Sequence, residues 1–522
     1  MYHFCTIISL GRDFSLENKD LEIKRMDVKF MAYKGKYARQ PEKTTKPKIS
    51  KILVISLIAL LLLGCAFGAC ALFSDGVAPP VTEETPPPTE TTLPPTETPT
   101  EPPTEPPTEP EPTEPVIYTA TVGAMGDLLM HSTIFDKYYS AEAYQNGTYN
   151  FDSIFKYIKD DITNLDYAAI NLETTLCGTN NGYDYSGYPS FNCPDEIIDG
   201  AKDAGFDMIL TANNHSYDTR LVGLKRTVNT IAEKGLEPLG TYSTPDTTKW
   251  VVKNINNINV GMLCYTYATD VSNGKPSLNA NPVIQEAGLC NYFYSGNLNA
   301  FYSEVEGYLA EMEDAGMDVS IMYIHWGNEY QLTSSAEQKA IAQKLCDMGI
   351  DVIVGGHPHV VQPMDLIEST VDPNHKTVCI YSTGNAISNQ RLGNLSSVKT
   401  AHTEDGVLFT VTFEKYEGGE AYVSDVNVIP TWVNMYTNSN GRREYNILPL
   451  HRNLVESWQE NFSLSNKAYS QAKESYDRTM AIIGEGMAEI TEYLATISHS
   501  PDTSGSSLFE MARTHRFING VG

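Results

Sequence analysis

The sequence predicts an α/β domain with central β-sheets flanked by helices, preceded by a membrane anchor and a stalk. Three observations lead to this prediction. From residue 116 onward, short apolar runs typical of buried strands alternate with amphipathic segments typical of helices. Polar residues cluster where several of these strands end. Before residue 116, a long apolar run is followed by a repeat rich in Pro, Thr and Glu, which marks two segments outside the packed domain.

Residues 1–73 predict a basic cytoplasmic segment (1–51) and a single transmembrane helix (52–73). The apolar run of 22 residues would extend about 33 Å as a helix, which is enough to cross a bilayer. Four lysines lie just before the run, and no Lys or Arg follows it before Lys137. The positive-inside rule therefore predicts a cytoplasmic N-terminus and an extracellular main domain. Two other interpretations stay open, namely a cleaved signal peptide and lipoprotein processing at Cys65.

Residues 74–115 form a low-complexity segment in which Thr-Glu-Pro-Pro repeats, with 10 acidic residues and no basic residue. Such a segment cannot bury a core. Its prolines favour an extended conformation of about 3.1 Å per residue, so it predicts a disordered stalk that reaches up to about 130 Å. The net charge of the whole chain is −28. An acidic surface repels polyanions, which argues against nucleic acid as a partner.

The domain at 116–455 is predicted from its alternating elements. Strands are expected at 117–125, 167–171, 206–210, 319–324, 352–354 and 378–381, and helices at 151–163, 221–234, 300–315 and 336–348. Residues 251–267 are expected to form two strands about a turn at Asn256 and Asn257, because Asn favours turns. Two longer strands are expected near 407–413 and 422–429.

Residues 456–522 are predicted to be a C-terminal helical segment appended to the domain, because 469–494 is helix-rich and of mixed polarity. The cysteines do not decide the redox compartment. Cys177 and Cys193 flank a loop rich in Gly, Asn and Tyr. A disulfide between them and two separate buried thiols are both open interpretations.

Five polar clusters follow predicted strands and carry the strongest functional signal in the sequence. They are Gly126-Asp127, Asn171-Leu172-Glu173, Asn213-Asn214-His215, His325-Trp326-Gly327 and Gly356-His357-Pro358-His359. Each cluster taken alone has an ordinary interpretation, such as a turn, a helix cap or a packed core pair. Ligand groups at the C-terminal ends of strands are a general feature of open α/β sheets, so the five clusters together favour one shared site.

The residue types in these clusters are those that a two-metal hydrolytic site requires. Such a site needs a carboxylate that can bridge two divalent ions, with imidazole and amide groups in the outer positions. The candidates are the carboxylates of Asp127 and Glu173, the amide of Asn214 and the imidazoles of His325, His357 and His359. In an extended segment alternate side chains point the same way, so His357 and His359 are expected to enter one site.

This ordered set of motifs resembles the CapA domain, which is named for capsule and poly-γ-glutamate synthesis proteins and belongs to the calcineurin-like metallophosphatase superfamily. The resemblance covers about residues 118–430 and extends to Ser382-Thr383-Gly384-Asn385. It implies a metallophosphatase-like α/β sandwich and two divalent metal ions, Mn, Zn or Fe. An N-terminal anchor is also typical of the family.

The resemblance implies a role for each residue. One ion would be bound by Asp127 and His359, the other by Asn214, His325 and His357, with Glu173 in the bridging position. His215 would be catalytic, as a proton donor or oxyanion stabiliser. The Asp-x-His start of the superfamily is absent, because Leu129 occupies the His position. His131 is either a replacement ligand or the start of the next helix.

Two functional interpretations follow. The first is a metal-dependent phosphoester hydrolase of capsule or poly-γ-glutamate synthesis, acting on an anionic envelope polymer or its phosphorylated precursor. The second is a non-catalytic component that binds or guides the polymer, with membrane-bound capsule synthesis proteins as partners. Tyr183, Tyr185 and Tyr188 would line a rim for the polymer, or belong to a surface loop without a ligand.

Overall fold

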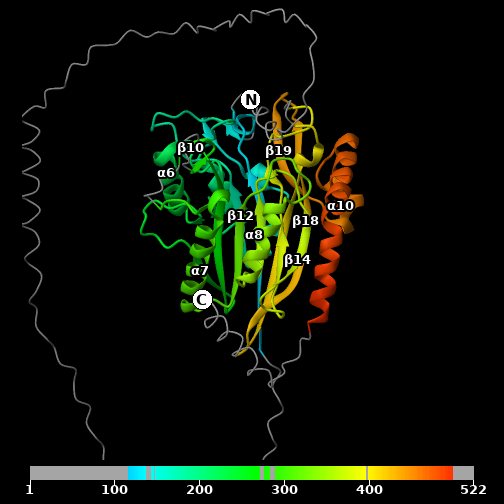
Figure 1. Ribbon diagram of the computed structural model, residues 1–522. Helices are drawn as coiled ribbons and strands as arrows, with labels where there is room; N and C mark the ends of the chain where they lie inside the picture. Colours follow the sequence, from blue (N-terminus) through cyan, green and yellow to red (C-terminus); the bar gives the residue numbers. More distant parts are fainter. Residues whose placement is uncertain are drawn as a thin grey trace, which may run out of the picture. The chain divides into compact units, whose positions relative to one another are not determined.

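Two mixed β-sheets form the centre of the structure (Figure 1). The computed structural model describes residues 116–136, 143–145, 147–270, 276–282, 288–394 and 398–497. The predicted cytoplasmic segment, transmembrane helix and stalk lie outside the described residues, as does 498–522. Among the described helices, none combines the length and the apolar character that a bilayer-spanning segment needs.

The first sheet has eight strands and places the ends of four parallel strands side by side. Its order is β19 (Arg443–Pro449), β18 (Ala421–Thr437), β17 (Asp405–Tyr416), β1 (Ile117–Leu128), β4 (Tyr167–Leu172), β5 (Met208–Leu210) and β6 (Glu237–Leu239), with β16 (Asn385–Ile387) paired to β1. The strands β1, β4, β5 and β6 run parallel, whereas β17, β18 and β19 are antiparallel to their neighbours.

The second sheet has nine strands. Its order is β10 (Asn281–Pro282), β9 (Pro276–Leu278), β8 (Ile258–Asp270), β12 (Val319–His325), β13 (Val352–Gly356), β15 (Lys376–Ile380) and β14 (Met364–Glu368), with β7 (Val251–Ile255) and β11 (Tyr292–Tyr294) also paired to β8. The predicted turn between β7 and β8 is confirmed, with positive φ at both Asn256 and Asn257. A short hairpin, β2 (Tyr144–Gln145) and β3 (Thr148–Tyr149), lies outside both sheets.

The two sheets pack face to face, and helices cover their outer faces. Alternate side chains of a strand point to opposite faces. Val122 of β1 and Ile321 of β12 therefore lie in the core between the sheets, while Met125 and Ile324 point outward. The helices in the connections are α2 (Ser132–Phe135), α3 (Asp152–Phe155), α4 (Lys159–Thr163), α5 (Glu196–Ala204), α6 (Arg220–Glu233), α7 (Leu298–Asp314) and α8 (Ala336–Asp347). Residues of α3, α4 and α5 pack on the first sheet, and residues of α7 and α8 pack on the second.

The C-terminal helix is part of the core, which corrects the prediction of an appended segment. After the short α9 (Trp458–Asn461), α10 (Asn466–Thr496) runs along β18 and reaches β14, so it contacts both sheets (Figure 1). Its residues Ile483 and Ile490 are fully buried in the core between the sheets. At Gly486 an added Cβ would lie 1.9 Å from the carbonyl oxygen of Met364, so only glycine permits this approach.

Other differences from the prediction are local. The single helix expected at 151–163 is two short helices, α3 and α4. The elements α5, β6, β11, β14 and β19 are not in the prediction, although each connects or extends predicted elements. Cys177 and Cys193 are separate buried thiols, so the disulfide interpretation is not supported.

Candidate metal centre

The predicted site residues come together where the ends of parallel strands from the two sheets face each other. Asp127 lies at the end of β1, and Glu173 directly follows β4. Because β1 and β4 are parallel neighbours, both carboxylates lie at one edge of the first sheet, and the backbone N–H of Glu173 donates to the carbonyl of Leu128. From the second sheet, His325 ends β12 and His357 follows β13.

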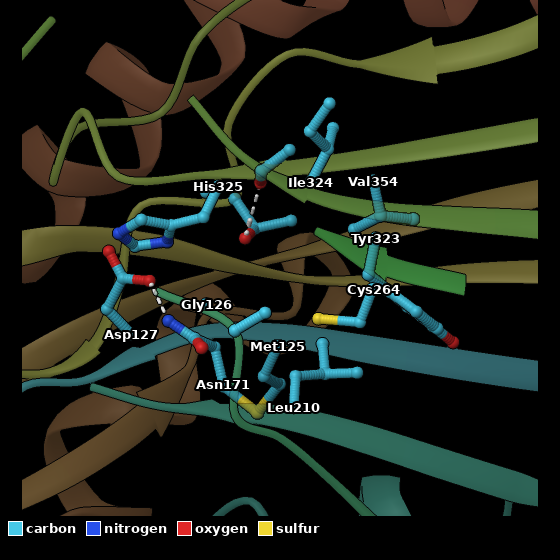
Figure 2. A pocket seen from close by; sticks show the side chains of 14 residues that line it. Met125, Gly126, Asp127, Asn171, Leu210, Cys264, Tyr323, Ile324, His325 and Val354 are labelled. Carbon is cyan, nitrogen blue, oxygen red and sulfur yellow. Dashed lines mark hydrogen bonds between the residues drawn. The ribbon is translucent and has the colours of Figure 1, made fainter. Parts of the chain in front are cut away.

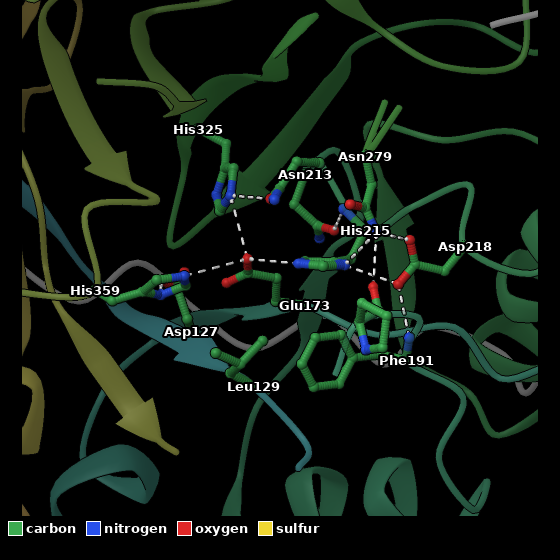
Figure 3. Close-up of polar contacts among 12 residues, drawn as sticks. Asp127, Leu129, Glu173, Phe191, Asn213, His215, Asp218, Asn279, His325 and His359 are labelled. Carbon is green, nitrogen blue, oxygen red and sulfur yellow. Dashed lines mark hydrogen bonds and ion pairs between the residues drawn. The ribbon is translucent and has the colours of Figure 1, made fainter. Parts of the chain in front are cut away.

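Glu173 is the centre of the cluster (Figure 3). Its side chain has no solvent exposure, and neither carboxylate oxygen has a hydrogen-bond partner. The oxygen Oε1 lies 3.6 Å from Nε2 of His325, 3.7 Å from Nε2 of His359 and 3.9 Å from Nε2 of His215. Burial, together with the negative charge of Asp127, holds the pKa of Glu173 well above its usual range. A buried carboxylate without partners is costly unless a cation neutralises it.

One group of metal-ligating atoms contains Asp127, Glu173 and His359, whose atoms lie within 4.8 Å of one another. Asp127 Oδ2 is 3.0 Å from Nδ1 of His359, and Oδ1 accepts a hydrogen bond of 2.7 Å from Asn171. Burial raises the pKa of Asp127, but its hydrogen bond with His359 and the charge of His359 help to leave this pKa below its ordinary value.

A second group contains Glu173, His325 and His357, again within 4.8 Å of one another. Burial lowers the pKa of His325 to about 3 and holds the pKa of His357 well below its usual range. Both imidazoles are therefore neutral, which is the form that binds a metal ion. Asn214 Oδ1 lies 2.9 Å from Nε2 of His325, so the predicted amide also reaches this group.

The two groups fit metal ions because they combine carboxylates with imidazoles and contain buried polar atoms without hydrogen-bond partners. Both groups are buried and share Glu173, and Nδ1 of His357 lacks a partner as well. Carboxylate oxygens mixed with imidazole nitrogens suit ions such as Mn, Zn or Fe. Orphaned polar atoms in a buried cluster otherwise cost free energy, so these residues could hold one or more metal ions.

His215 is oriented by Asp218 and Asn279, two residues that were not predicted to belong to the site. Its Nδ1 lies 2.7 Å from Oδ2 of Asp218. The carboxylate of Asp218 also accepts hydrogen bonds from the backbone N–H of Phe191 at 2.6 Å and from the side chain of Asn279 at 2.7 Å. Asp218 follows His215 by three residues, and this short spacing could have identified Asp218 as its partner from the sequence. Asn279 lies between β9 and β10, and nothing in the neighbouring sequence indicated that it would reach the site.

The two histidines of Gly-His-Pro-His converge through a bend, which corrects the expectation of an extended segment. His357 and His359 have φ values of 95° and 56°, in the left-handed region. Their ring centroids are 5.8 Å apart. The backbone N–H of Tyr330 donates to the carbonyl of Pro358 at 2.8 Å, which ties this bend to the loop after β12. Positive φ is unfavourable for these residues, so the surrounding contacts hold it.

Glycines let the backbone segments beneath the site approach closely. A Cβ on Gly126 would lie 1.9 Å from the carbonyl oxygen of Gly384, and a Cβ on Gly355 would lie 2.0 Å from that of Tyr381. Asp127 and His325 also line a small pocket, together with residues such as Asn171, Cys264 and Tyr323 (Figure 2).

The remaining candidates lie around the cluster without joining either group. Leu129 is buried, and Nδ1 of His131 lies 3.1 Å from the carbonyl oxygen of Leu129. His131 is absent from both groups of metal-ligating atoms. In the tyrosine-rich loop, Tyr185 packs against Tyr149, whereas Tyr188 is 79% exposed.

The fold and the cluster together define an α/β protein with buried carboxylate and imidazole groups that could hold metal ions. The chain belongs to the family described as "Bacterial capsule synthesis protein PGA_cap", which matches residues 121–390. This confirms the family resemblance of the motifs.

Two curated relatives are similar to the chain. The capsule biosynthesis protein CapA of Bacillus anthracis is 27% identical over 252 residues, covering 46% of this chain and 55% of the relative. The PGA biosynthesis protein CapA of Bacillus subtilis (strain 168) is 27% identical over 271 residues, covering 51% of this chain and 62% of the relative. The chain thus matches less than two thirds of the length of either relative.

Proposed function

We propose that the protein is a metal-dependent phosphoester hydrolase of capsule or poly-γ-glutamate synthesis. The observation that carries this proposal is the buried Glu173 carboxylate, which has no hydrogen-bond partner and is surrounded by three imidazoles. Glu173 would bridge two divalent ions, Mn, Zn or Fe. Asp127 and His359 would complete one ligand set, and Asn214, His325 and His357 the other.

The protein residues divide the chemical tasks between them. When bound, the two ions would polarise a phosphoryl oxygen and lower the pKa of a water molecule. With the Nδ1 hydrogen of His215 donated to Asp218, Nε2 faces the cluster. A protonated His215 could then give its Nε2 proton to the leaving oxygen and become the neutral imidazole. The hydrogen bonds of Asp218 with Phe191 and Asn279 hold this pair in one orientation.

The proposed substrate is an anionic envelope polymer or its phosphorylated precursor. The relatives are named for capsule and PGA biosynthesis, which supports this substrate class. The proposed location is extracellular, with residues 52–73 as a single transmembrane anchor and 74–115 as a stalk, supported by the apolar run and the Pro-rich repeat. Membrane-bound capsule synthesis proteins are the proposed partners.

A second candidate is a non-catalytic component that binds or guides the polymer. One observation favours it: the relatives are named for biosynthesis, and neither name mentions hydrolysis. In that case the metal ions would stabilise the fold or bind an anionic polymer without turnover.

One experiment separates these candidates. Purified full-length chain is analysed for bound metal and assayed with p-nitrophenyl phosphate and bis-p-nitrophenyl phosphate, beside Glu173→Gln. The hydrolase proposal expects two metal equivalents and turnover that the variant loses. Metal binding without turnover, together with normal capsule formation in cells carrying Glu173→Gln, would support the second candidate and refute the first.

A further inference from the structure

Asn385 lies next to the first group of ligands on a neighbouring strand. It begins β16, which pairs in parallel with the end of β1, and Asn385 is the direct partner of Asp127. Paired residues on adjacent strands point to the same face of a sheet. The side chain of Asn385 has no solvent exposure. Asn385 therefore lies beside Asp127 in the interior of the site.

Hydrogen bonds fix the orientation of the Asn385 amide. Its nitrogen Nδ2 lies 3.2 Å from the carbonyl oxygen of His359, 3.0 Å from that of Thr403 and 3.2 Å from Oε1 of Gln390. All three groups are acceptors, so the nitrogen must face them. The amide oxygen Oδ1 is then directed away from these acceptors, and it has no hydrogen-bond partner.

The two groups of ligands also differ in the number of donors that they offer. Glu173, His325 and His357 have Asn214 as a fourth donor, because Oδ1 of Asn214 is 2.9 Å from the His325 ring. Asp127, Glu173 and His359 provide three. Divalent ions of this kind take four or more ligands. Asn385 donates a hydrogen bond to the carbonyl of His359, which belongs to the group with only three donors. We therefore assign the unpaired amide oxygen of Asn385 to that group.

We propose that the amide oxygen of Asn385 is a ligand of the metal ion held by Asp127, Glu173 and His359. Each ion would then have one asparagine oxygen, Asn214 on one side and Asn385 on the other. This inference rests on the proposed function only in that the site holds metal, and it does not depend on catalysis or on the substrate.

Metal affinity tests the proposal on the full chain, with Co²⁺ as the probe. Asn385→Leu keeps the approximate volume and removes the oxygen, so we expect the affinity for one Co²⁺ equivalent to fall by about 10- to 100-fold. The visible spectrum of that equivalent should change, and the other equivalent should keep its affinity within about threefold. Gln390→Leu removes one acceptor of the Asn385 nitrogen and leaves the oxygen in place, so it is the matched control and should preserve both affinities.

Two results would overturn the proposal. If Asn385→Leu binds both equivalents as tightly as the wild type, the oxygen is not a ligand. If Gln390→Leu causes the same loss, Asn385 acts only by positioning the bend at His359. A wild type that takes up no Co²⁺ would refute the proposed function as well, whereas a change confined to Asn385→Leu concerns this inference alone.

A second measurement covers the case in which Asn385→Leu does not fold. The chain is labelled with ¹³C at the asparagine side-chain carbonyl, loaded with Mn²⁺ and measured by electron–nuclear double resonance. Asn214→Asp keeps a ligating oxygen at position 214 but removes the labelled carbonyl there, so a carbonyl coupling that persists in this variant supports Asn385 as a ligand. Its disappearance would contradict the proposal.

Discussion

The two sheets contribute different chemistry to the candidate metal centre. The first sheet supplies both carboxylates, Asp127 and Glu173, and the amide of Asn214. The second sheet supplies imidazoles, His325, His357 and His359. Neither sheet alone presents the mixed set of carboxylate and imidazole ligands. The difference shows that the site forms only when the sheets pack face to face.

This division has an energetic consequence. The carboxylates of the first sheet are fully buried, so each requires hydrogen-bond donors or a positive charge nearby. The imidazoles of the second sheet are kept neutral at His325 and His357 by burial. Neutral imidazoles at His325 and His357 beside buried carboxylates are an arrangement that a metal ion can complete.

The largest effect is expected at Glu173, because it is shared by both groups. Glu173→Gln retains the shape and removes the charge that would bridge the ions. We expect affinity for both metal equivalents to fall by more than about 100-fold, beyond the range for outer-shell partners. Phosphoester turnover should fall by about 1,000-fold or more. Metal analysis and steady-state kinetics measure these losses, and Glu368→Gln, on an exposed side chain, is the control.

His325 tests whether the two sheets serve separate ions. His325→Ala removes a second-sheet ligand from one group and leaves Asp127, Glu173 and His359 intact. We expect one equivalent to be lost and the other to bind within about tenfold of wild type, because the three residues that would bind it directly remain. His375→Ala, whose ring contacts the carbonyl of Ile350 instead, should retain both. Equal loss of both equivalents would show that the groups are not separable.

The ion pair between Arg478 of α10 and Asp405 of β17 shows how this helix is held against the first sheet. Arg478 forms hydrogen-bonded ion pairs of 2.7 and 2.9 Å with Asp405, whose side chain is 1% exposed. Arg478→Ala would leave a buried carboxylate with one donor, Ser475. We expect a loss of about 3 kcal/mol in the free energy of unfolding, measured with urea.

Lys415 provides the matched control for Arg478. Lys415 is on β17 and pairs at 2.7 Å with Asp318, which directly precedes β12 of the second sheet, but this partner is 17% exposed. Lys415→Ala should cost about 1 kcal/mol or less, since solvent screens this pair. An effect of equal size for both substitutions would contradict the role of burial at Asp405.

The smallest effect concerns a surface pair on the outer side of the first sheet. His451 Nε2 lies 2.9 Å from Oδ1 of Asp161, and this hydrogen bond raises the pKa of His451. The folded state therefore holds the proton more tightly, so the stabilisation is present below the ordinary pKa of about 6.5 and is lost as pH rises through the folded pKa. His451→Gln should cost less than about 1 kcal/mol at pH 5.5 and nothing at pH 9, as measured by urea unfolding at both values. An equal cost at the two pH values would rule out the charge as its cause.

The sequence determined the elements whose signals are local. Short apolar runs predicted the strands that lead to Asp127, Glu173 and His325, and helical periodicity predicted the helices between them. Both patterns depend only on neighbours a few residues away. The strand-end position of the polar clusters also predicted that their side chains would meet. The bend at His357 and His359 was missed, since its positive φ values depend on contacts with distant loops.

The tertiary structure decided what depends on packing between distant segments. The order of strands in two sheets placed β16 beside β1 and thereby brought Asn385 to Asp127, although 258 positions separate them in the chain. It also brought Asn279 to Asp218 and packed α10 across both sheets. The sequence alone therefore determined which residues stand at the strand ends, because local periodicity indicates where each strand ends. Only the face-to-face packing of the sheets decided which carboxylate meets which imidazole, because that contact has no local signal.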